Sequence, residues 1–210
     1  MSTLEPGIAD ILLRSRHTLC EILEDRGYNS EPYRNIAPEQ IGILATNPRS
    51  MDMIVEKQKP GNAPCDRAMV VYMTESSIAP RFLESKMSEI DLTGSVDLLV
   101  ILTQDDNEAF DQYSLKVWRE NKQRVTFFHL KHLVLHLGRH VLVPPHRKLT
   151  DAEARTEMDR YSVTQKTQFP LIKHSDIQAR ILGLVPGDLV EVLRPSPTAG
   201  VARVLRICAA

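Results

Sequence analysis

The first clear pattern along the chain is that of an amphipathic helix. Between Ile8 and Leu23, apolar side chains recur at intervals of three and four residues, which places them on one helical face. Arg26 falls in the last turn of this predicted helix, and Gly27 is suited to end it. A short second helix is predicted at residues 38–44.

Further along, short apolar runs alternate with helical patterns. Strands are predicted at residues 68–73, 96–102 and 125–130, because each run is short and rich in β-branched, aromatic or other apolar residues. Helices are predicted between them at residues 78–90 and 108–122. Crossovers of this length permit parallel pairing, so the pattern predicts an α/β unit around a central sheet.

The last third of the chain shows a different order of elements. Thr150 and Glu153 form a T-x-x-E capping box that opens a predicted helix, which runs to about residue 161. A second helix is predicted to start at a cap on Ser175 or Asp176 and to end at Gly183. This region, residues 141–210, is predicted to be a second domain after a first domain at residues 1–140.

Two closing strands are predicted at residues 189–193 and 201–207. The segment between them, R-P-S-P-T-A-G at residues 194–200, has the prolines, serine and glycine that are typical of a turn. Because an apolar strand follows it, the segment is predicted to be a shaped loop rather than a flexible linker, and such loops often carry contacts.

Composition places the chain among ordinary globular proteins. Hydrophobic residues make up 42% and charged residues 25% of its 210 residues, and its apolar runs are much shorter than a membrane span. The first residues lack the basic and apolar segments of a signal peptide. The three cysteines form no C-x-x-C pair, which indicates a reducing compartment such as the cytosol or the nucleus.

The charge pattern argues against strong autonomous binding to DNA. The formal net charge is −1, with 16 basic and 20 acidic side chains in residues 1–140 and 10 and 7 in residues 141–210. This asymmetry is too mild to supply the concentrated basic face that such binding usually needs.

A cluster of histidines begins at the end of the third predicted strand and is a candidate metal site. Its members are His129, His132, His136 and His140. On one continuous helix the four histidines would lie on the same side. The alternation of Leu133, Leu135 and Leu137 favours extended backbone instead, which would spread the histidines over roughly 35 Å. No nearby cysteine or carboxylate completes a ligand set, so we predict no metal site.

One short motif is compatible with enzyme chemistry. Glu84-Ser-Lys86 fits the E-x-K pattern of metal-dependent nucleases, and Asp97 lies on a predicted strand. Glu84 precedes Asp97 and lies in a helical stretch, so the order and placement do not suit carboxylates that must converge on a metal ion. The chain has no G-x-S-x-G, Walker A or G-x-G-x-x-G motif. We therefore predict no catalytic residue, cofactor site or metal site.

A longer ordered set of residues gives the chain a family resemblance. It comprises H-V-L-V-P-P-H at residues 140–146, Q-F-P at 168–170, D-I-Q-A-R at 176–180 and R-P-S-P-T-A-G at 194–200. The set resembles the assembly domain of the fifth-largest subunit of the eukaryotic nuclear RNA polymerases, which has a shorter counterpart in the archaeal enzyme. In the first domain, R-H-T-L at 16–19 and D-R-G-Y at 25–28 resemble the opening helix of the eukaryotic jaw domain.

The resemblance implies a fold and a function. The fold is α/β in the first domain and α+β overall: a jaw domain related to restriction endonucleases, followed by a small mixed α/β assembly domain. The function is that of a non-catalytic subunit of a nuclear DNA-directed RNA polymerase. The assembly domain would dock on the largest subunit, beside neighbouring small subunits, and the jaw domain would lie near downstream duplex DNA, with weak or indirect contact. The implied location is the nucleus, or the nucleolus for a subunit specific to RNA polymerase I, and no membrane is involved.

The resemblance also nominates residues for subunit docking. They are His146, Pro170, Asp176, Arg180, Gly183, Arg194, Pro195, Ser196, Thr198, Ala199 and Gly200. A local role stays open for each: the glycines also suit helix ends and turns, and the arginines could instead pair with Asp176 or Asp188 inside the domain.

Three departures from the family pattern bear on these expectations. Where the family has D-P-V-A-R-Y, this chain has D-I-Q-A-R-I at residues 176–181, and where the family has S-E-T, it has Ser196-Pro197-Thr198.

The loop that approaches downstream DNA is usually small and neutral in the family. Here it is Gln104, Asp105, Asp106, Asn107 and Glu108. Its three carboxylates would repel phosphate, so we expect this loop to touch DNA differently or not at all. Such divergence suggests a paralogue specialised for one polymerase.

Two other functions remain open from the sequence. One is a metal-dependent nuclease of restriction-endonuclease-like fold that uses Glu84. The other is a free-standing transcription adaptor that carries the assembly domain without the polymerase. Co-purification of the large polymerase subunits separates both from the preferred interpretation.

Overall fold

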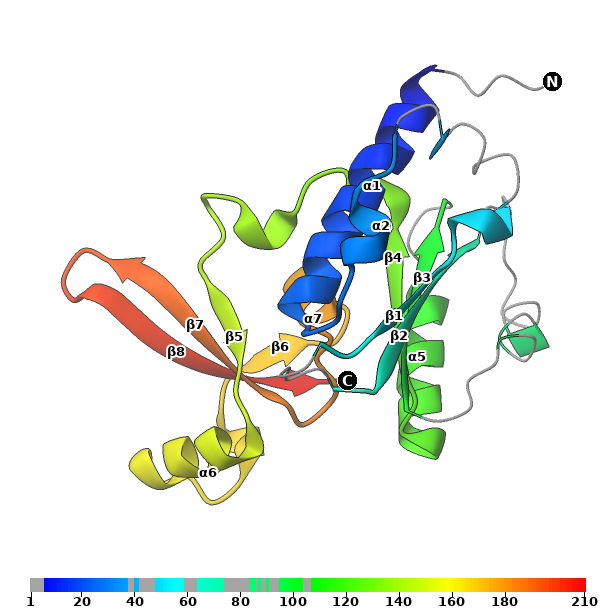
Figure 1. Ribbon diagram of the computed structural model, residues 1–210. Coiled ribbons are helices and arrows are strands. Elements are labelled where there is room, and N and C mark those ends of the chain that lie inside the picture. The colour runs from blue at the N-terminus through cyan, green and yellow to red at the C-terminus, as the bar shows by residue number, and fades with distance from the viewer. Residues whose placement is uncertain are drawn as a thin grey trace. The chain divides into compact units, whose positions relative to one another are not determined.

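The computed structural model describes residues 6–37, 40–41, 48–58, 64–73, 84–85, 87, 90, 95–103 and 107–210. Its contacts divide the chain into two compact units, Met1–His136 and Leu137–Ala210 (Figure 1). No helix among these residues is both long and apolar enough to cross a membrane. The predicted helices at residues 38–44 and 78–90 lie largely outside the described residues.

The first unit opens with the predicted helix, α1 (Pro6–Asp25). Gly27 follows it with a φ of 92°, in the left-handed region that glycine adopts without strain, and the amide of Tyr28 donates to the carbonyl of Leu23 at 2.9 Å. The short helix α2 (Glu31–Arg34) comes next. The predicted stop at Gly27 is therefore confirmed.

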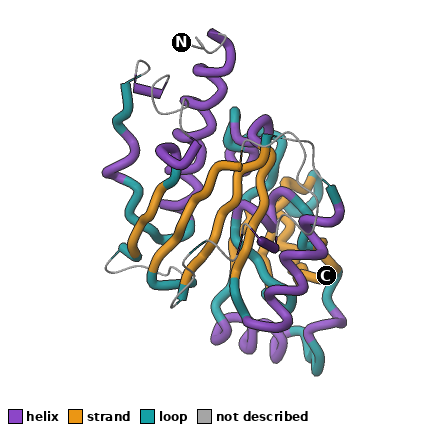
Figure 2. The backbone as a smooth tube through the Cα atoms, turned by 90° about the vertical axis from the view of Figure 1, so that its right-hand side faces the viewer, coloured by secondary structure: helices purple, strands orange, loops and turns teal. Residues whose placement is uncertain are grey.

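A four-stranded sheet forms the centre of this unit. The strands are β1 (Met53–Glu56), β2 (Arg67–Met73), β3 (Val96–Leu102) and β4 (Arg124–His129), in that order across the sheet. The last three pair in parallel, as predicted, while β1 pairs with β2 in antiparallel fashion. Figure 2 shows the strands of this sheet side by side. Strand β1 was not predicted, because its four residues are too few to show a clear period.

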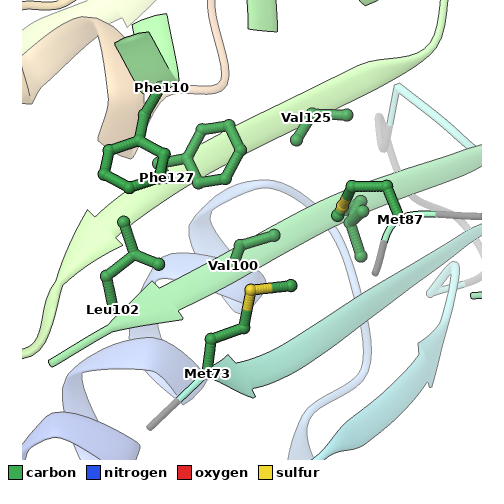
Figure 3. Packing of buried hydrophobic residues seen from close by; sticks show 8 residues of the cluster. Met73, Met87, Val100, Leu102, Phe110, Val125 and Phe127 are labelled. Atoms are coloured by element: carbon green, nitrogen blue, oxygen red, sulfur yellow. The ribbon is translucent and has the colours of Figure 1, made fainter. Parts of the chain in front are cut away.

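Helix α5 (Glu108–Asn121) covers one face of this sheet. Its Phe110 ring lies 5.2 Å from the ring of Phe127 on β4, and Val100 and Leu102 of β3 complete the same apolar cluster with Met73 of β2 (Figure 3). Strand β3 is buried along its whole length, as a central parallel strand covered on both faces must be. The opposite face meets the end of α1, where Arg26 contacts Asp97 of β3.

The histidine-containing segment after β4 differs from the prediction of extended backbone. It forms two 3₁₀ turns, Leu130–Leu133 and Leu137–Arg139, and the rings of His129 and His132 lie 5.4 Å apart. The alternating leucines wrongly predicted extended backbone, because 3₁₀ turns this short have no apolar periodicity by which the sequence could identify them. Within the described residues no group of three potential ligand side chains is arranged to hold a metal ion.

The second unit is built on another four-stranded sheet. Its strands are β5 (His146–Lys148), β6 (Leu171–Lys173), β7 (Leu189–Ser196) and β8 (Gly200–Ala209), in the order β5-β7-β8-β6. Strands β6 and β8 run in parallel, and the other neighbours run in antiparallel fashion. Two of these strands, β5 and β6, were not predicted, because each has only three residues.

Alternate residues of β7 and β8 face two different apolar clusters. Leu189 and Ile207 pack with Ala154 of helix α6 (Asp151–Arg160), whereas Val190 and Cys208 pack with Ala179 of helix α7 (Ile177–Ile181). Since successive side chains of a strand point to opposite faces, the two helices cover opposite sides of this sheet. Both predicted caps are confirmed: Thr150 and Glu153 form the capping box of α6, and Asp176 caps α7.

Candidate functional site

The segment predicted as a loop, residues 194–200, is for the most part a hairpin. Strands β7 and β8 stay in register up to the pair Ser196 and Gly200, so the predicted loop is wrong except for the three residues between them. Pro195 fits inside β7 because its missing N–H faces away from β8. The amide of Leu193, two residues earlier, points the same way and donates to Pro145 at 3.0 Å.

The turn at the hairpin tip is held by local hydrogen bonds. The hydroxyl of Ser196 accepts from the amide of Ala199 at 3.3 Å and lies 3.4 Å from the hydroxyl of Thr198. Gly200 has a φ of 69°, which explains the glycine at this position. All of residues 197–200 are exposed. Ser196 and Gly200 thus shape the tip, while Thr198 and Ala199 project at its end.

The outer part of the hairpin lacks covering strands on both sides. Strand β5 pairs with β7 only at residues 190–192, and β6 pairs with β8 only at residues 207–209. Figure 1 shows β7 and β8 running on beyond the ends of β5 and β6. Leu193 and Val201 are 38% and 62% exposed, and with Pro195 they lie on one face of the hairpin. The described structure leaves this apolar face uncovered.

Arg194 lies on the other face of the hairpin, opposite Ala202. It is exposed and forms no ion pair with any described carboxylate. Asp188, proposed as a local partner from the sequence, is instead bound by Lys148, with 2.6 Å between the ammonium and a carboxylate oxygen. The charge of Arg194 is therefore available to another molecule.

The base of the hairpin is fixed by an alternating chain of charges. Glu191 of β7 accepts from Arg203 of β8 and from Arg147 of β5, the latter at 3.0 Å. Arg203 also donates to Glu157 at 2.8 Å, and Arg147 donates to Glu153 at 2.7 Å, which ties both arginines to α6. These contacts connect three strands and one helix just below the uncovered part of the hairpin.

The charges of this network shift the pKa values of its members. The amide of Thr150 and the guanidinium of Arg147 lower the pKa of Glu153 to about 2, and the guanidinium of Arg203 lowers the pKa of Glu191. The carboxylates in turn raise the pKa values of Arg147 and Arg203. All four groups stay charged at neutral pH, so the network persists under ordinary conditions.

The remaining docking candidates lie elsewhere in the unit. His146 begins β5, and its Nδ1 donates to the carbonyl of Pro144 at 2.6 Å. Pro170 is exposed, and its carbonyl accepts from the amide of Ile207 at 2.8 Å. Asp176 caps α7, Arg180 within α7 is only 5% exposed, and Gly183 is buried with a φ of 60°. The structure therefore does not gather all the candidates in one place, and Asp176 and Gly183 have local roles that explain them.

Two exposed apolar residues were missed from the sequence. Val141 and Leu142 are 90% and 83% exposed, although they belong to the H-V-L-V-P-P-H string at residues 140–146. They lie in an ordered turn, in which Val143 donates to the carbonyl of His140 at 2.8 Å and Leu142 donates to its Nδ1 at 3.3 Å. An apolar pair followed by two prolines was a signal that could have identified them.

Of the acidic loop, residues 104–106 lie outside the described residues. Asn107 caps α5, its side chain accepting from the amide of Ala109 at 3.1 Å, and Glu108 begins that helix. A carboxylate in the first turn stabilises a helix, which gives Glu108 a local explanation. The expectation about DNA contact at this loop remains a prediction.

The carboxylates of the nuclease alternative are engaged by cations. Asp97 is buried and accepts from Arg26 at 2.9 Å, and Glu84 pairs with Lys116 on α5 at 2.9 Å. Lys86 lies outside the described residues. A carboxylate that is buried against a guanidinium cannot serve as a metal ligand without losing that partner, so the structure gives no support to a nuclease centre at Asp97.

Comparison with known proteins matches both units. Residues 135–208 match the family model "RNA polymerase Rpb5, C-terminal domain". Over 69 residues, 33% of this chain and 83% of the relative, the sequence is 45% identical to "DNA-directed RNA polymerase subunit Rpo5" of Pyrococcus abyssi.

Two relatives extend the similarity over most of the chain. One is "DNA-directed RNA polymerases I, II, and III subunit rpabc1" of Dictyostelium discoideum, 27% identical over 94% of this chain and 96% of that protein. The other is "DNA-directed RNA polymerases IV and V subunit 5B" of Arabidopsis thaliana, 26% identical over 85% of this chain and 80% of that protein.

Proposed function

This chain belongs to the Rpb5 family of DNA-directed RNA polymerase subunits, and we propose that its β7–β8 hairpin docks on the largest subunit of a nuclear polymerase. The first unit would then form part of the lower jaw, close to downstream DNA. Members of this family are non-catalytic subunits, so polymerisation itself belongs to the large subunits.

The observation that carries the docking proposal is the uncovered hairpin. An isolated two-stranded hairpin is at best marginally stable in water, and this one holds Leu193, Pro195 and Val201 on a face that no other described element covers. Burial of that face against another subunit would stabilise both. The salt-bridge network around Glu191 supports the same role, because it holds the base of the hairpin in place before the partner arrives.

Val141 and Leu142 extend the proposed docking surface. Two large aliphatic side chains that are almost fully exposed and held in an ordered turn are typical of anchors that enter a pocket on a partner. Arg194, on the opposite face of the hairpin, adds a positive charge that pairs with no described carboxylate, which suits a carboxylate on a subunit that contacts both faces. The proposed docking region thus combines apolar anchors on one face with a charge on the other that would fix orientation.

For the first unit we propose a position beside DNA without strong binding. The chain as a whole carries a formal net charge of −1, and the acidic side chains at residues 105, 106 and 108 would oppose phosphate at that loop. A subunit held by protein contacts does not need its own affinity for DNA. A polymerase–DNA structure that placed Asp105 or Asp106 against phosphate without a bridging cation would contradict this arrangement.

The proposed location is the nucleus, as for the eukaryotic polymerases named by two of the relatives. Those names include polymerases I, II and III for one protein and polymerases IV and V for the other. A role in one specialised polymerase is therefore as compatible with the sequence as a shared role.

Affinity purification tests the proposal. The tagged full chain, purified at moderate salt from eukaryotic cells that express it, should retain the large polymerase subunits in stoichiometric amounts, and the identity of the largest subunit would show which polymerase it joins. Absence of those subunits would favour the free-standing adaptor. Mg²⁺-dependent DNA cleavage by the purified chain, lost in Glu84→Ala, would favour the nuclease.

A matched pair of variants tests the hairpin itself. Val201→Asp places a charge on the uncovered face and should lower retention of the largest subunit at least about tenfold. Ile54→Asp changes an exposed residue of the first unit and should leave retention unchanged. Circular dichroism of both variants confirms that the fold persists. Equal retention of the two variants would exclude the hairpin as the main docking element.

A further inference from the structure

The hairpin tip contains a serine–proline dipeptide, a pattern that one class of protein kinase modifies. Ser196 is followed directly by Pro197, and nowhere else in the 210 residues does a serine or threonine precede a proline. A hydroxyl followed by proline is the minimal substrate signature of proline-directed protein kinases. The single occurrence of this signature falls at the tip of the hairpin, between the end of β7 and the start of β8.

The structure leaves this serine half-buried between exposed neighbours. Pro195 and residues 197–200 are exposed, and no described strand pairs with either outer edge of the hairpin at the tip. The turn is held by the long hydrogen bonds of the Ser196 hydroxyl, at 3.3 Å to Ala199 and 3.4 Å to Thr198, and by one backbone bond, in which the amide of Val201 donates to the carbonyl of Ala199 at 2.7 Å. Local opening into the extended conformation that kinases bind therefore costs few contacts.

We propose that Ser196 is a phosphorylation site for a proline-directed kinase and that its phosphate prevents the hairpin from docking. In the transfer, the Ser196 Oγ attacks the γ-phosphorus of ATP, the bond from that phosphorus to the bridging oxygen breaks, and ADP leaves. The hydroxyl proton passes to the catalytic base of the kinase. The product is a phosphate monoester that carries about −1.5 to −2 charges at neutral pH.

Arg194 is placed to hold this phosphate. It precedes Ser196 by two residues on the same strand, so both side chains lie on the same face at a backbone spacing of about 7 Å. The long guanidinium side chain can span that distance, and it has no described carboxylate partner to lose. An ion pair between the phosphate and Arg194 would withdraw the charge that Arg194 offers to a docking partner.

The effect on docking rests on the function proposed above. If the tip is buried against another subunit, the phosphate must lose its bound water or keep the subunits apart, and either lowers the affinity. Phosphorylation would then act on the free chain, before assembly, because the assembled polymerase would cover the site. Only unmodified chains would enter the complex.

The first experiment tests the modification alone. The purified full chain is incubated with ATP and, separately, a cyclin-dependent kinase and a mitogen-activated kinase, and the sites are mapped by mass spectrometry. At least one kinase should add about one phosphate per chain at Ser196. Ser196→Ala and Pro197→Ala should each lower phosphate incorporation at least about tenfold. The control variant Thr198→Ala should not lower it. Failure of both kinases, or incorporation that survives Ser196→Ala, would overturn the proposal.

The second experiment tests the consequence. Phosphorylated and untreated chains are compared for retention of the largest polymerase subunit, with kinase-treated Ser196→Ala as the control. The phosphorylated chain should be retained at least about tenfold less than the other two. Equal retention would overturn the proposed control of docking. If the untreated chain itself retained no polymerase, the proposed function would fail, whatever the outcome of the kinase reaction.

Discussion

Arg26, just beyond the end of α1, donates from Nη1 to Oδ2 of Asp97 on β3 at 2.9 Å, and the two side chains are only 2% and 1% exposed. The hydroxyl of Tyr28 lies 3.3 Å from the same carboxylate oxygen. Burial and the negative charge of Asp97 raise the pKa of Tyr28, so its hydroxyl keeps the proton that it donates. This buried pair joins the first helix to the central strand of the first unit.

Loss of Arg26 should destabilise the first unit strongly. Arg26→Met leaves the Asp97 carboxylate buried without its cation, and breaking such a pair costs about 3–5 kcal/mol. Urea unfolding followed by the fluorescence of Trp118, the only tryptophan, measures the loss in this unit. A loss below about 1 kcal/mol would show that the pair behaves like a solvated surface contact.

The double variant Arg26→Met/Asp97→Leu is the matched control. Replacing both members of a buried pair by apolar side chains is often neutral or stabilising, because neither charge is left without a partner. The double variant should therefore be more stable than Arg26→Met alone. If both variants lost the same stability, the packing of the arginine stem, rather than its charge, would be the important contact.

The sequence placed both of these residues to within one position but could not pair them. Periodicity put Asp97 in a buried strand, which is confirmed, and Arg26 in the last turn of a helix that in fact ends one residue earlier, at Asp25. Their contact spans 71 positions and depends on how the helix lies across the sheet. Local patterns carry no information about such a packing angle, so the sequence argued against a metal site at Asp97 only from the order of the carboxylates and could not identify its partner.

At the β7–β8 hairpin, a local sequence pattern gave a wrong prediction. Two prolines and a glycine predicted a loop at residues 194–200, yet residues 194–196 continue β7. Proline is excluded from a strand only where its N–H would be needed, and at Pro195 the backbone faces an edge without a partner. That fact depends on where β5 ends, and the three residues of β5 gave no sequence signal of their own. The local caps at Thr150 and Asp176 were predictable because their hydrogen bonds lie within three residues.

Acid should release the network at the base of the hairpin. Glu153 and Glu191 have pKa values below the ordinary value of 4.5, with Glu153 at about 2. Groups with a lowered pKa in the folded state stabilise it above the unfolded pKa and lose that contribution as the pH falls through the folded value. Protection of β7 and β8 amides from hydrogen exchange should therefore decline between about pH 4.5 and about pH 2.

Glu191→Gln tests the source of this acid sensitivity. At neutral pH the variant should protect the hairpin amides less than the native chain does, because Arg147 and Arg203 lose their shared carboxylate. Near pH 2 the difference should disappear, since the native glutamates are then being protonated. A constant difference over the whole range would mean that the carboxylate charge is not what stabilises the hairpin.

The three cysteines should be inert in the folded chain. Cys20, Cys65 and Cys208 are all buried, and burial raises the pKa of each thiol, that of Cys208 to about 12. The thiolate is the reactive form, so an aromatic disulfide reagent should label none of them in the native protein, even at about pH 9, and all three in urea. Rapid native labelling of one cysteine would reveal local opening around it.

Pro197 is the position at which this hairpin departs from the S-E-T pattern of its family. It is exposed in a short turn whose hydrogen bonds come from Ser196 and from the backbone of Ala199 and Val201, so Pro197→Glu should preserve the fold. The new carboxylate would lie three residues from Arg194 on the proposed docking surface and should change which polymerase retains the chain. Quantifying each largest subunit in a pull-down of the variant and of the native chain measures this directly. Pro197→Ala removes the proline without adding a charge, so it separates the loss of the proline from the gain of a carboxylate. If the native chain, Pro197→Ala and Pro197→Glu all retained the same polymerase, a role for this position in selecting the polymerase would be ruled out.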